Sequence, residues 1–249
     1  MNFELVFRHW DLFLGGIWVT LHLTALALFF GFLIALPASL SLARRSRFSP
    51  LVRGYVYVFR GTPLLVQTYL VYYGLAQFEF VRESWAWFFL REAWWCAVIV
   101  FSLNAGAYGA AILRGAIKTT PKGEIDGAKS LGLSERQVTW LVLMPSALRR
   151  ALPQFGNEVV FMLHGTVVAS IITIQDILGV GRTVNAKYYI AYEGLLSAAA
   201  LYMIITFVLV WLFRQVEKRY LRHLDIDSGK AKKAPGKVVG AAAGMPQMR

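Results

Sequence analysis

The sequence predicts an all-α membrane protein of about five transmembrane helices. Hydrophobic residues make up 57% of the 249 residues, aromatic residues make up 14%, and the mean hydropathy is +0.52. A soluble domain has a more polar balance. Five stretches lack Lys, Arg, Asp and Glu, and each is near the roughly 20 residues that a spanning helix requires. They lie between Asp11 and Arg44, between Arg60 and Glu79, between Glu92 and Arg114, between Glu158 and Asp176, and between Glu193 and Arg214.

The distribution of basic residues predicts the orientation of these helices. Of the 26 Lys and Arg residues, five lie in the 44–60 loop, seven in the segment 114–153 and nine after residue 213. The opposite side carries the rest, namely Arg8, Arg82, Arg91, Arg182 and Lys187. Cytoplasmic loops are enriched in basic residues, so the N-terminus is expected outside and the C-terminus in the cytoplasm.

The net charge of +12 follows from this topology. Its basic residues are dispersed over loops between spans, so a nucleic-acid-binding patch is not expected. Residues 1–224 are assigned to one transmembrane domain. The tail at 225–249 is low in complexity and is expected to be a disordered cytoplasmic segment that touches anionic lipid headgroups.

The second and third stretches carry further patterns. Small residues recur four positions apart in the third, in the pairs Ala105 and Gly109, Gly106 and Ala110, and Ala107 and Ala111. This spacing lets helices approach closely in lipid, so a helix bundle is expected. The second stretch begins with Arg60-Gly61-Thr62-Pro63, which has two interpretations. It is either an interfacial anchor with a proline near the helix start or a gating or coupling element.

A charged, helix-forming segment at 121–132 separates the third and fourth spans on the predicted cytoplasmic side. Thr120 is expected to cap a helix that has Pro121 at its first position. Glu124 and Asp126 favour the positive end of the helix dipole. The segment therefore begins with a short helix over about 121–131.

A corner and a second helix follow. Gly132 suits a left-handed helix stop, and Ser134 with Gln137 has the spacing of a capping box. The second helix is expected to run towards Pro145. The elbow that results has exposed charges and a buried side made of Ile125, Ala128 and Leu131. Such a shape suits a surface that another protein binds.

The chain carries no pattern typical of an enzyme. It has no G-x-x-x-x-G-K-[ST] phosphate-binding loop, no H-E-x-x-H and no G-x-S-x-G. The four histidines are scattered, and the single Cys96 has no Cys or His neighbour at metal-ligand spacing. We therefore expect no catalytic residue, metal site or cofactor in this chain.

Three segments resemble the permease subunits of bacterial ATP-binding-cassette importers. Asp126-Gly127-Ala128 and Gly132 match a loop that reads Glu-Ala-Ala, three residues, Gly in that family, with Asp and Gly as departures. "VFRGTPLLVQTYLVYYG" at 58–74 resembles the second span of the polar amino-acid subfamily. "NEVVFMLH" at 157–164 resembles the M permease subunit for histidine and basic amino acids, or its opine-transporting relatives. The resemblance covers about residues 10–224.

The resemblance implies a type I importer permease in a bacterial inner membrane. Its solute would be a basic amino acid such as histidine, arginine, lysine or ornithine; octopine, nopaline or another polar amino acid is the alternative. Partners would be a periplasmic solute-binding protein, a second permease subunit that is related or identical, and a cytoplasmic ATPase dimer that binds ATP and Mg. The ATPase-coupling residues would be Glu124, Asp126, Gly127, Ala128 and Gly132. A stand-alone ion-coupled carrier is the remote alternative.

Glu158, at the border of the fourth span, is the candidate determinant of solute selectivity. One face of its helical wheel carries Glu158, Met162, Gly165 and Ala169, and the small residues indicate that this face looks into the bundle. A carboxylate in that place needs a cationic partner. The partner is either a cationic solute, in a pathway that includes Asn157 and Met162, or a structural arginine such as Arg60 or Arg150.

Overall fold

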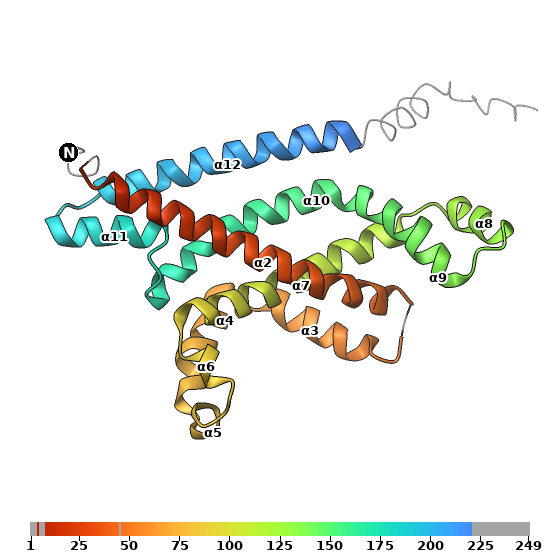
Figure 1. The fold of residues 1–249 in the computed structure, drawn as a ribbon, viewed down its shortest axis with the longest axis horizontal. Helices are drawn as coiled ribbons and strands as arrows, with labels where there is room; N and C mark the ends of the chain where they lie inside the picture. Colours follow the sequence, from red (N-terminus) through yellow and green to blue (C-terminus); the bar gives the residue numbers. More distant parts are fainter. Residues whose placement is uncertain (1–3, 5–7, 45, 221–249) are drawn as a thin grey trace, which may run out of the picture.

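The computed structural model describes residue 4, residues 8–44 and residues 46–220, so the predicted tail at 225–249 lies outside the described residues. Every regular element in the described part is a helix, and the helices form an elongated bundle (Figure 1). Four of these helical runs are long and apolar enough to cross a membrane: α2 (Trp10–Arg44), α7 (Ala93–Lys118), the run Glu135–Ile172 and α12 (Glu193–Tyr220). The all-α membrane class is confirmed.

Helices α2 and α7 pack along each other through small residues. A Cβ atom added to Gly31 of α2 would lie 2.6 Å from the Cβ of Ala105 on α7. A Cβ added to Gly109 would lie 3.0 Å from the Cβ of Ala35. Glycine is therefore needed at Gly31, and the predicted close packing of the small residues in the third span is confirmed.

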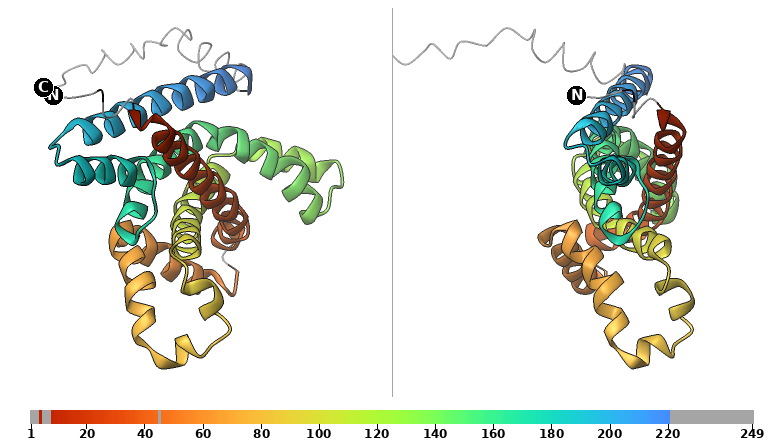
Figure 2. Two further views of the ribbon diagram at one scale, coloured as in Figure 1. Left: turned by 60° about the vertical axis from the view of Figure 1, so that its left-hand side comes forward. Right: turned by 90° about the vertical axis from the view of Figure 1, so that its left-hand side faces the viewer.

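The second expected span is broken into short pieces. Helix α3 (Ser49–Gly61) ends before Thr62, and α4 (Leu64–Tyr69) begins after Pro63. A π-helical turn, η1 (Leu70–Gly74), and a 3-10 turn, η2 (Leu75–Gln77), complete the run. The short helices α5 (Glu79–Arg82) and α6 (Trp87–Leu90) follow and project from the bundle (Figures 1 and 2), whereas α4 packs against α7.

The fourth expected span is longer than its uncharged stretch. After α8 (Lys122–Ser130), the chain runs through α9 (Glu135–Gln137), a π-helical turn η3 (Val138–Leu143), α10 (Met144–Gly165) and a 3-10 segment η4 (Thr166–Ile172). Pro145 does not end the helix, because it stands at the start of α10, where a missing N–H costs little. Glu158 is therefore inside a long helix and not at its border.

Helix α11 (Ile177–Tyr188) packs against α12 and α2 and lies at the opposite end of the molecule from α8 (Figure 1). Its N-terminus is capped by buried Asp176, whose Oδ1 accepts a hydrogen bond from the Gly179 N–H at 2.8 Å. Asp176 Oδ2 accepts another from the Tyr202 hydroxyl of α12, also at 2.8 Å. These two hydrogen bonds satisfy the carboxylate and fix α11 to α12.

Candidate functional site

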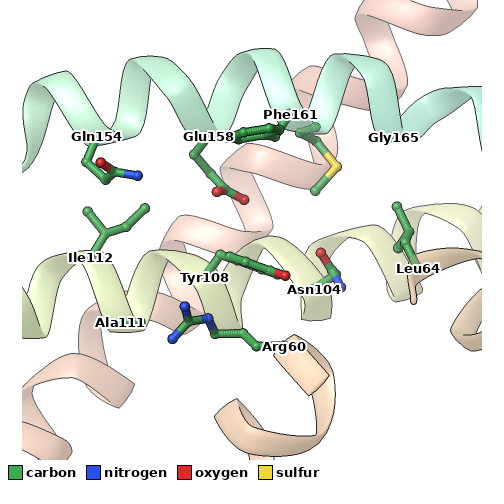
Figure 3. Close-up of a pocket in the computed structure, with 11 residues that line it drawn as sticks. Arg60, Leu64, Asn104, Tyr108, Ala111, Ile112, Gln154, Glu158, Phe161 and Gly165 are labelled. Carbon is green, nitrogen blue, oxygen red and sulfur yellow. The ribbon is translucent and has the colours of Figure 1, made fainter. Parts of the chain in front are cut away.

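A cavity of about 630 Å³ lies between α7 and α10, beside the break between α3 and α4 (Figure 3). Its wall combines an arginine, a carboxylate, two amides and a tyrosine with apolar side chains. That mixture suits a small polar ligand, because the few polar groups can orient it. The lining residues are Arg60, Leu64, Asn104, Tyr108, Ala111, Ile112, Gln154, Glu158, Phe161, Met162 and Gly165.

Glu158 directs its carboxylate from α10 into this cavity (Figure 3). The residue is 6% exposed, and Met162, one helical turn further on, is 3% exposed. Ala169, on the same predicted face, is fully buried. The expectation that this face looks into the bundle is therefore confirmed. Within the described part of the chain, the Glu158 carboxylate forms neither a hydrogen bond nor an ion pair with a protein group.

The two arginines proposed as structural partners of Glu158 behave differently. Arg150 donates from Nη2 to Glu124 Oε1 at 3.1 Å, so the interpretation that it pairs with Glu158 is wrong. Arg60 lies across the cavity, with its guanidinium carbon 5.1 Å from the centroid of the Tyr108 ring. Tyr108 stands between Arg60 and Glu158 (Figure 3). The two charges therefore share one cavity without forming an ion pair.

The predicted pathway residue Asn157 does not line the cavity. It is exposed, because one residue along an α-helix rotates the side chain by about 100° away from the face of Glu158. Gln154, Asn104 and Tyr108 line the cavity instead, and sequence reasoning missed them. Gln154 could have been found, because it precedes Glu158 by one helical turn. Asn104 is a polar side chain in an uncharged span, which is also a recognisable signal.

Arg60 is positioned by the break in the second span. Between α3 and α4, Thr62 and Pro63 are extended, which leaves backbone carbonyls without helical donors. Gln67 Nε2 donates to the Phe59 carbonyl at 2.8 Å and to the Thr62 carbonyl at 3.0 Å. Asn104 Nδ2 donates to the same Phe59 carbonyl at 3.2 Å and to Gln67 Oε1 at 3.1 Å. These amides therefore supply donors to the backbone carbonyls at the break that follows Arg60.

The predicted elbow is present at the end of the molecule opposite α11 (Figure 1). Gly132 has φ of +79°, as expected for a left-handed stop. Ser134 and Gln137 form the predicted capping box, in which each side chain bonds the backbone N–H of the other residue. Ala128 is buried at 6% exposure, while Asp126 and Gly127 are exposed.

Two details of the elbow differ from the prediction. Thr120 does not cap α8, because its hydroxyl donates to the Ala116 carbonyl of α7 at 3.1 Å, and Pro121 takes the N-cap position. Leu131 was expected to be buried but is 84% exposed, because α8 ends at Ser130 and the chain turns away before Gly132. Ile125 is half-buried. The buried side of the elbow is therefore narrower than predicted.

Ion pairs fix the elbow to itself and to α10. Lys129 Nζ lies 2.7 Å from Glu135 Oε1 across the Gly132 corner. The hydrogen bond to this carboxylate raises the pKa of the exposed Lys129 ammonium. Glu124 of α8 pairs with Arg150 of α10 at 3.1 Å, two helical turns before Glu158. The elbow is thus connected directly to the helix that carries the cavity carboxylate.

Comparison with known proteins identifies the kind of protein that has this geometry. The sequence pattern of the family described as "Binding-protein-dependent transport system inner membrane component" matches residues 27–222. The chain belongs to this family. It is a membrane permease subunit, and the resemblance seen in the elbow, the second span and α10 is confirmed.

Curated relatives are similar to this permease over most of its length. The octopine transport system permease protein OccM of Rhizobium radiobacter is 40% identical over 82% of this chain and 84% of its own length. The arginine ABC transporter permease protein ArtM of Haemophilus influenzae is 38% identical, over 87% and 95%. The histidine/lysine/arginine/ornithine transport system permease protein HisM of Escherichia coli (strain K12) is 37% identical, over 86% and 90%.

Solved structures share the fold of the permease. A chain from the crystal structure of an amino acid ABC transporter with histidines superposes with a TM-score of 0.77 at 30% identity, covering 88% of this chain and 99% of that one. A chain of the MetNI methionine ABC transporter gives a TM-score of 0.71 at 18% identity, covering 84% and 96%. The helical arrangement is therefore that of an amino acid ABC transporter permease.

Proposed function

We propose that the permease carries cationic amino acids or opines through the inner membrane of a bacterium. The observation that supports this solute class is the Glu158 carboxylate, which lies buried in the cavity without an ion pair from the described protein groups. A buried carboxylate is costly unless a cation compensates it. An ammonium or guanidinium on the solute is such a cation.

The rest of the cavity suits the amino-acid end of the same solute. Arg60 carries a positive charge across from Glu158, with Tyr108 between the two (Figure 3). One solute could then pair its α-carboxylate with Arg60 and its cationic side chain with Glu158. The solutes named for the relatives, which are octopine, arginine and histidine/lysine/arginine/ornithine, are of this class.

The partners proposed for the permease follow from its family and its elbow. A periplasmic binding protein delivers the solute, and a second permease subunit, related or identical, completes the pathway. A cytoplasmic ATPase dimer, which binds the ATP and Mg that this chain is not expected to bind, docks on the elbow. Glu124, Asp126, Gly127, Ala128 and Gly132 are the proposed coupling residues, and Arg60-Gly61-Thr62-Pro63 is a proposed gating segment.

Reconstitution tests this function. The permease is placed in liposomes alone and together with its ATPase, second permease and binding protein, and uptake of arginine, histidine, octopine and glutamine is measured. We expect uptake only in the complete assembly with ATP, and faster uptake of the cationic solutes than of glutamine. Uptake by the permease alone under an ion gradient would instead support a secondary carrier.

Reporter fusions test the proposed orientation. Fusions after Phe78 and after Asn185 should report the outside, and fusions after Arg47, Glu124 and Leu224 should report the cytoplasm. A cytoplasmic signal at Asn185, or an outside signal at Glu124, would contradict the proposed topology and with it ATPase docking on the elbow.

A further inference from the structure

Three arginines line one polar cavity of about 430 Å³ at the turn between α2 and α3. Arg47 comes from the turn, Arg53 from α3 and Arg114 from α7. The remaining lining residues are Leu42, Ser46, Ser49 and Pro50. No carboxylate of the described residues lines the cavity, so three positive charges share one space. Charges of one sign in such a place repel each other, and a bound anion relieves that repulsion.

Arg47, Arg53 and Arg114 form no ion pair with a carboxylate of the described residues, although Arg53 Nε donates to the Ser49 carbonyl at 3.4 Å. Arg150 pairs with Glu124, and Arg44 donates to the Thr139 hydroxyl. Among the described residues, the Nε atoms of Arg114 and Arg150 are both buried without a hydrogen-bond partner, and of these two arginines Arg114 lines the cavity. A buried donor without an acceptor is unfavourable, so Arg114 requires an acceptor from another molecule.

An apolar groove meets the arginine cavity at the same turn. Its volume is about 580 Å³, and Ser46 lines both spaces. The groove lies between the two helices and is lined by apolar residues that include Leu33, Ile34 and Pro37 of α2 and Leu51, Val52 and Tyr55 of α3. Leu51 is 75% exposed. The groove is therefore open to a long apolar ligand that enters from the membrane.

We propose that the turn between α2 and α3 binds one anionic phospholipid. Its headgroup phosphate lies among Arg47, Arg53 and Arg114, and one acyl chain lies in the groove between α2 and α3. Guanidinium groups recognise phosphate oxygens by paired hydrogen bonds. The apolar walls of the groove would pack against the acyl chain. This end of the bundle is the one that the basic residues place at the cytoplasmic leaflet, where anionic lipids attract basic pockets.

The groove distinguishes a lipid from a free anion. Inorganic phosphate or a nucleotide would satisfy the arginines, but it would leave the apolar walls around Leu51 and Val52 without a ligand. A phospholipid fills both spaces at once, and the two spaces meet at Ser46. The lipid site is independent of the solute that the permease carries.

Native mass spectrometry of the assembled transporter tests the proposal. The delipidated complex is titrated with phosphatidylglycerol, with phosphatidylcholine, or with inorganic phosphate followed by phosphatidylglycerol. We expect one phosphatidylglycerol per copy of this permease, weaker retention of phosphatidylcholine, and no competition by inorganic phosphate. Equal retention of both lipids would overturn the proposal, and displacement by inorganic phosphate would assign the arginines to a free anion.

Charge variants locate the lipid on the chain. Arg53→Gln and Arg114→Gln should each weaken phosphatidylglycerol binding by about fivefold, and Arg53→Lys should weaken it less than Arg53→Gln, because an ammonium keeps the charge but cannot form the paired hydrogen bonds. Arg149→Gln is the matched control. Arg149 is an exposed arginine near the N-terminus of α10, and it lines neither the arginine cavity nor the apolar groove. Equal binding by Arg53→Gln, Arg114→Gln and Arg149→Gln would exclude this site.

Photo-crosslinking keeps the test independent of variant folding. A phosphatidylglycerol with a photoreactive acyl chain is added to the unmodified complex, and the attached peptides are identified after proteolysis. The expected attachment lies within residues 33–55. Attachment confined to other segments would contradict the proposal. Binding that appears only after the ATPase is removed would also contradict it, because a partner subunit would then cover the arginines.

Discussion

The elbow around Gly132 and the cavity around Glu158 are held by contacts of different range along the chain. At the elbow, Lys129 pairs with Glu135 and Ser134 caps its own helix through Gln137, so the shape depends on near neighbours in sequence. At the cavity, Arg60, Tyr108 and Glu158 come from α3, α7 and α10. The shape of the elbow therefore depends on local contacts, whereas the shape of the cavity depends on how three helices pack.

One ion pair connects the two regions. Glu124 belongs to the elbow, and Arg150 belongs to the helix that carries Glu158. A displacement of the elbow by a docked ATPase would therefore be transmitted to α10 and to the cavity wall. The comparison predicts that cavity variants change which solute is carried, and that elbow variants change how efficiently ATP hydrolysis drives any solute.

The largest effect is expected at the cavity carboxylate. Glu158→Gln should lower uptake of arginine or octopine by about 10- to 100-fold, since a hydrogen bond to a charged group contributes about 1.5–3 kcal/mol. Uptake of a neutral amino acid should change less. The measurement is solute uptake in proteoliposomes with matched protein levels. Glu217→Gln, on α12 and outside the cavity, is the control. An equal loss for cationic and neutral solutes would favour a structural role of Glu158.

The next effect is expected at the elbow corner. Gly132→Val places a β-branched residue at φ of +79°, which costs about 1–3 kcal/mol although the surrounding space is open. Asp126→Lys reverses an exposed charge in the proposed ATPase contact. Both variants should insert normally and lower the ratio of solute transported to ATP hydrolysed by about tenfold, equally for all solutes. Gly123→Ala is the control, because a Cβ added at this position of α8 would meet no neighbouring atom within 4 Å. Normal coupling in both variants would remove the elbow from the mechanism.

A smaller effect is expected at the ion pair between the two regions. Arg150→Gln and Glu124→Gln should each lower coupling by about three- to tenfold, since breaking a partly buried charged contact costs about 1 kcal/mol or more. The double variant should be no worse than either single variant, because the two side chains form one interaction. ATP hydrolysis and uptake are measured together, with Arg149→Gln as the control. Additive losses would show that the two residues act separately.

The smallest effect is expected inside the elbow. Lys129→Ala removes an exposed ion pair whose side chains are 48% and 77% exposed, and solvent screening leaves such pairs with little effect on stability. Uptake should stay within about twofold of that of the unmodified permease. The midpoint temperature of thermal unfolding of the complex should hardly change. A large loss of coupling in this variant would mean that Lys129 contacts the ATPase directly.

The sequence determined the features whose causes are local. Uncharged stretches of sufficient length predicted the long helices α2, α7 and α12, because the apolar interior of a bilayer accepts only such segments. Gly132 and the capping box at Ser134 predicted the corner of the elbow, because each motif acts through backbone geometry within a few residues. The helical wheel also placed Glu158 on an inward face correctly.

Only the tertiary structure decided which distant residues meet. Thr120 has the chemistry of a cap, yet it bonds back to α7, and Arg150 pairs with Glu124 where a pair with Glu158 was also conceivable. Asn104 and Gln67 complete the broken second span, which no spacing rule along the chain specifies. These contacts depend on how α3, α7 and α10 cross. The spacing of small residues predicted that the third span packs closely, but only the structure shows that Gly106 of α7 faces Tyr55 of α3 and that Gly109 faces Phe155 of α10.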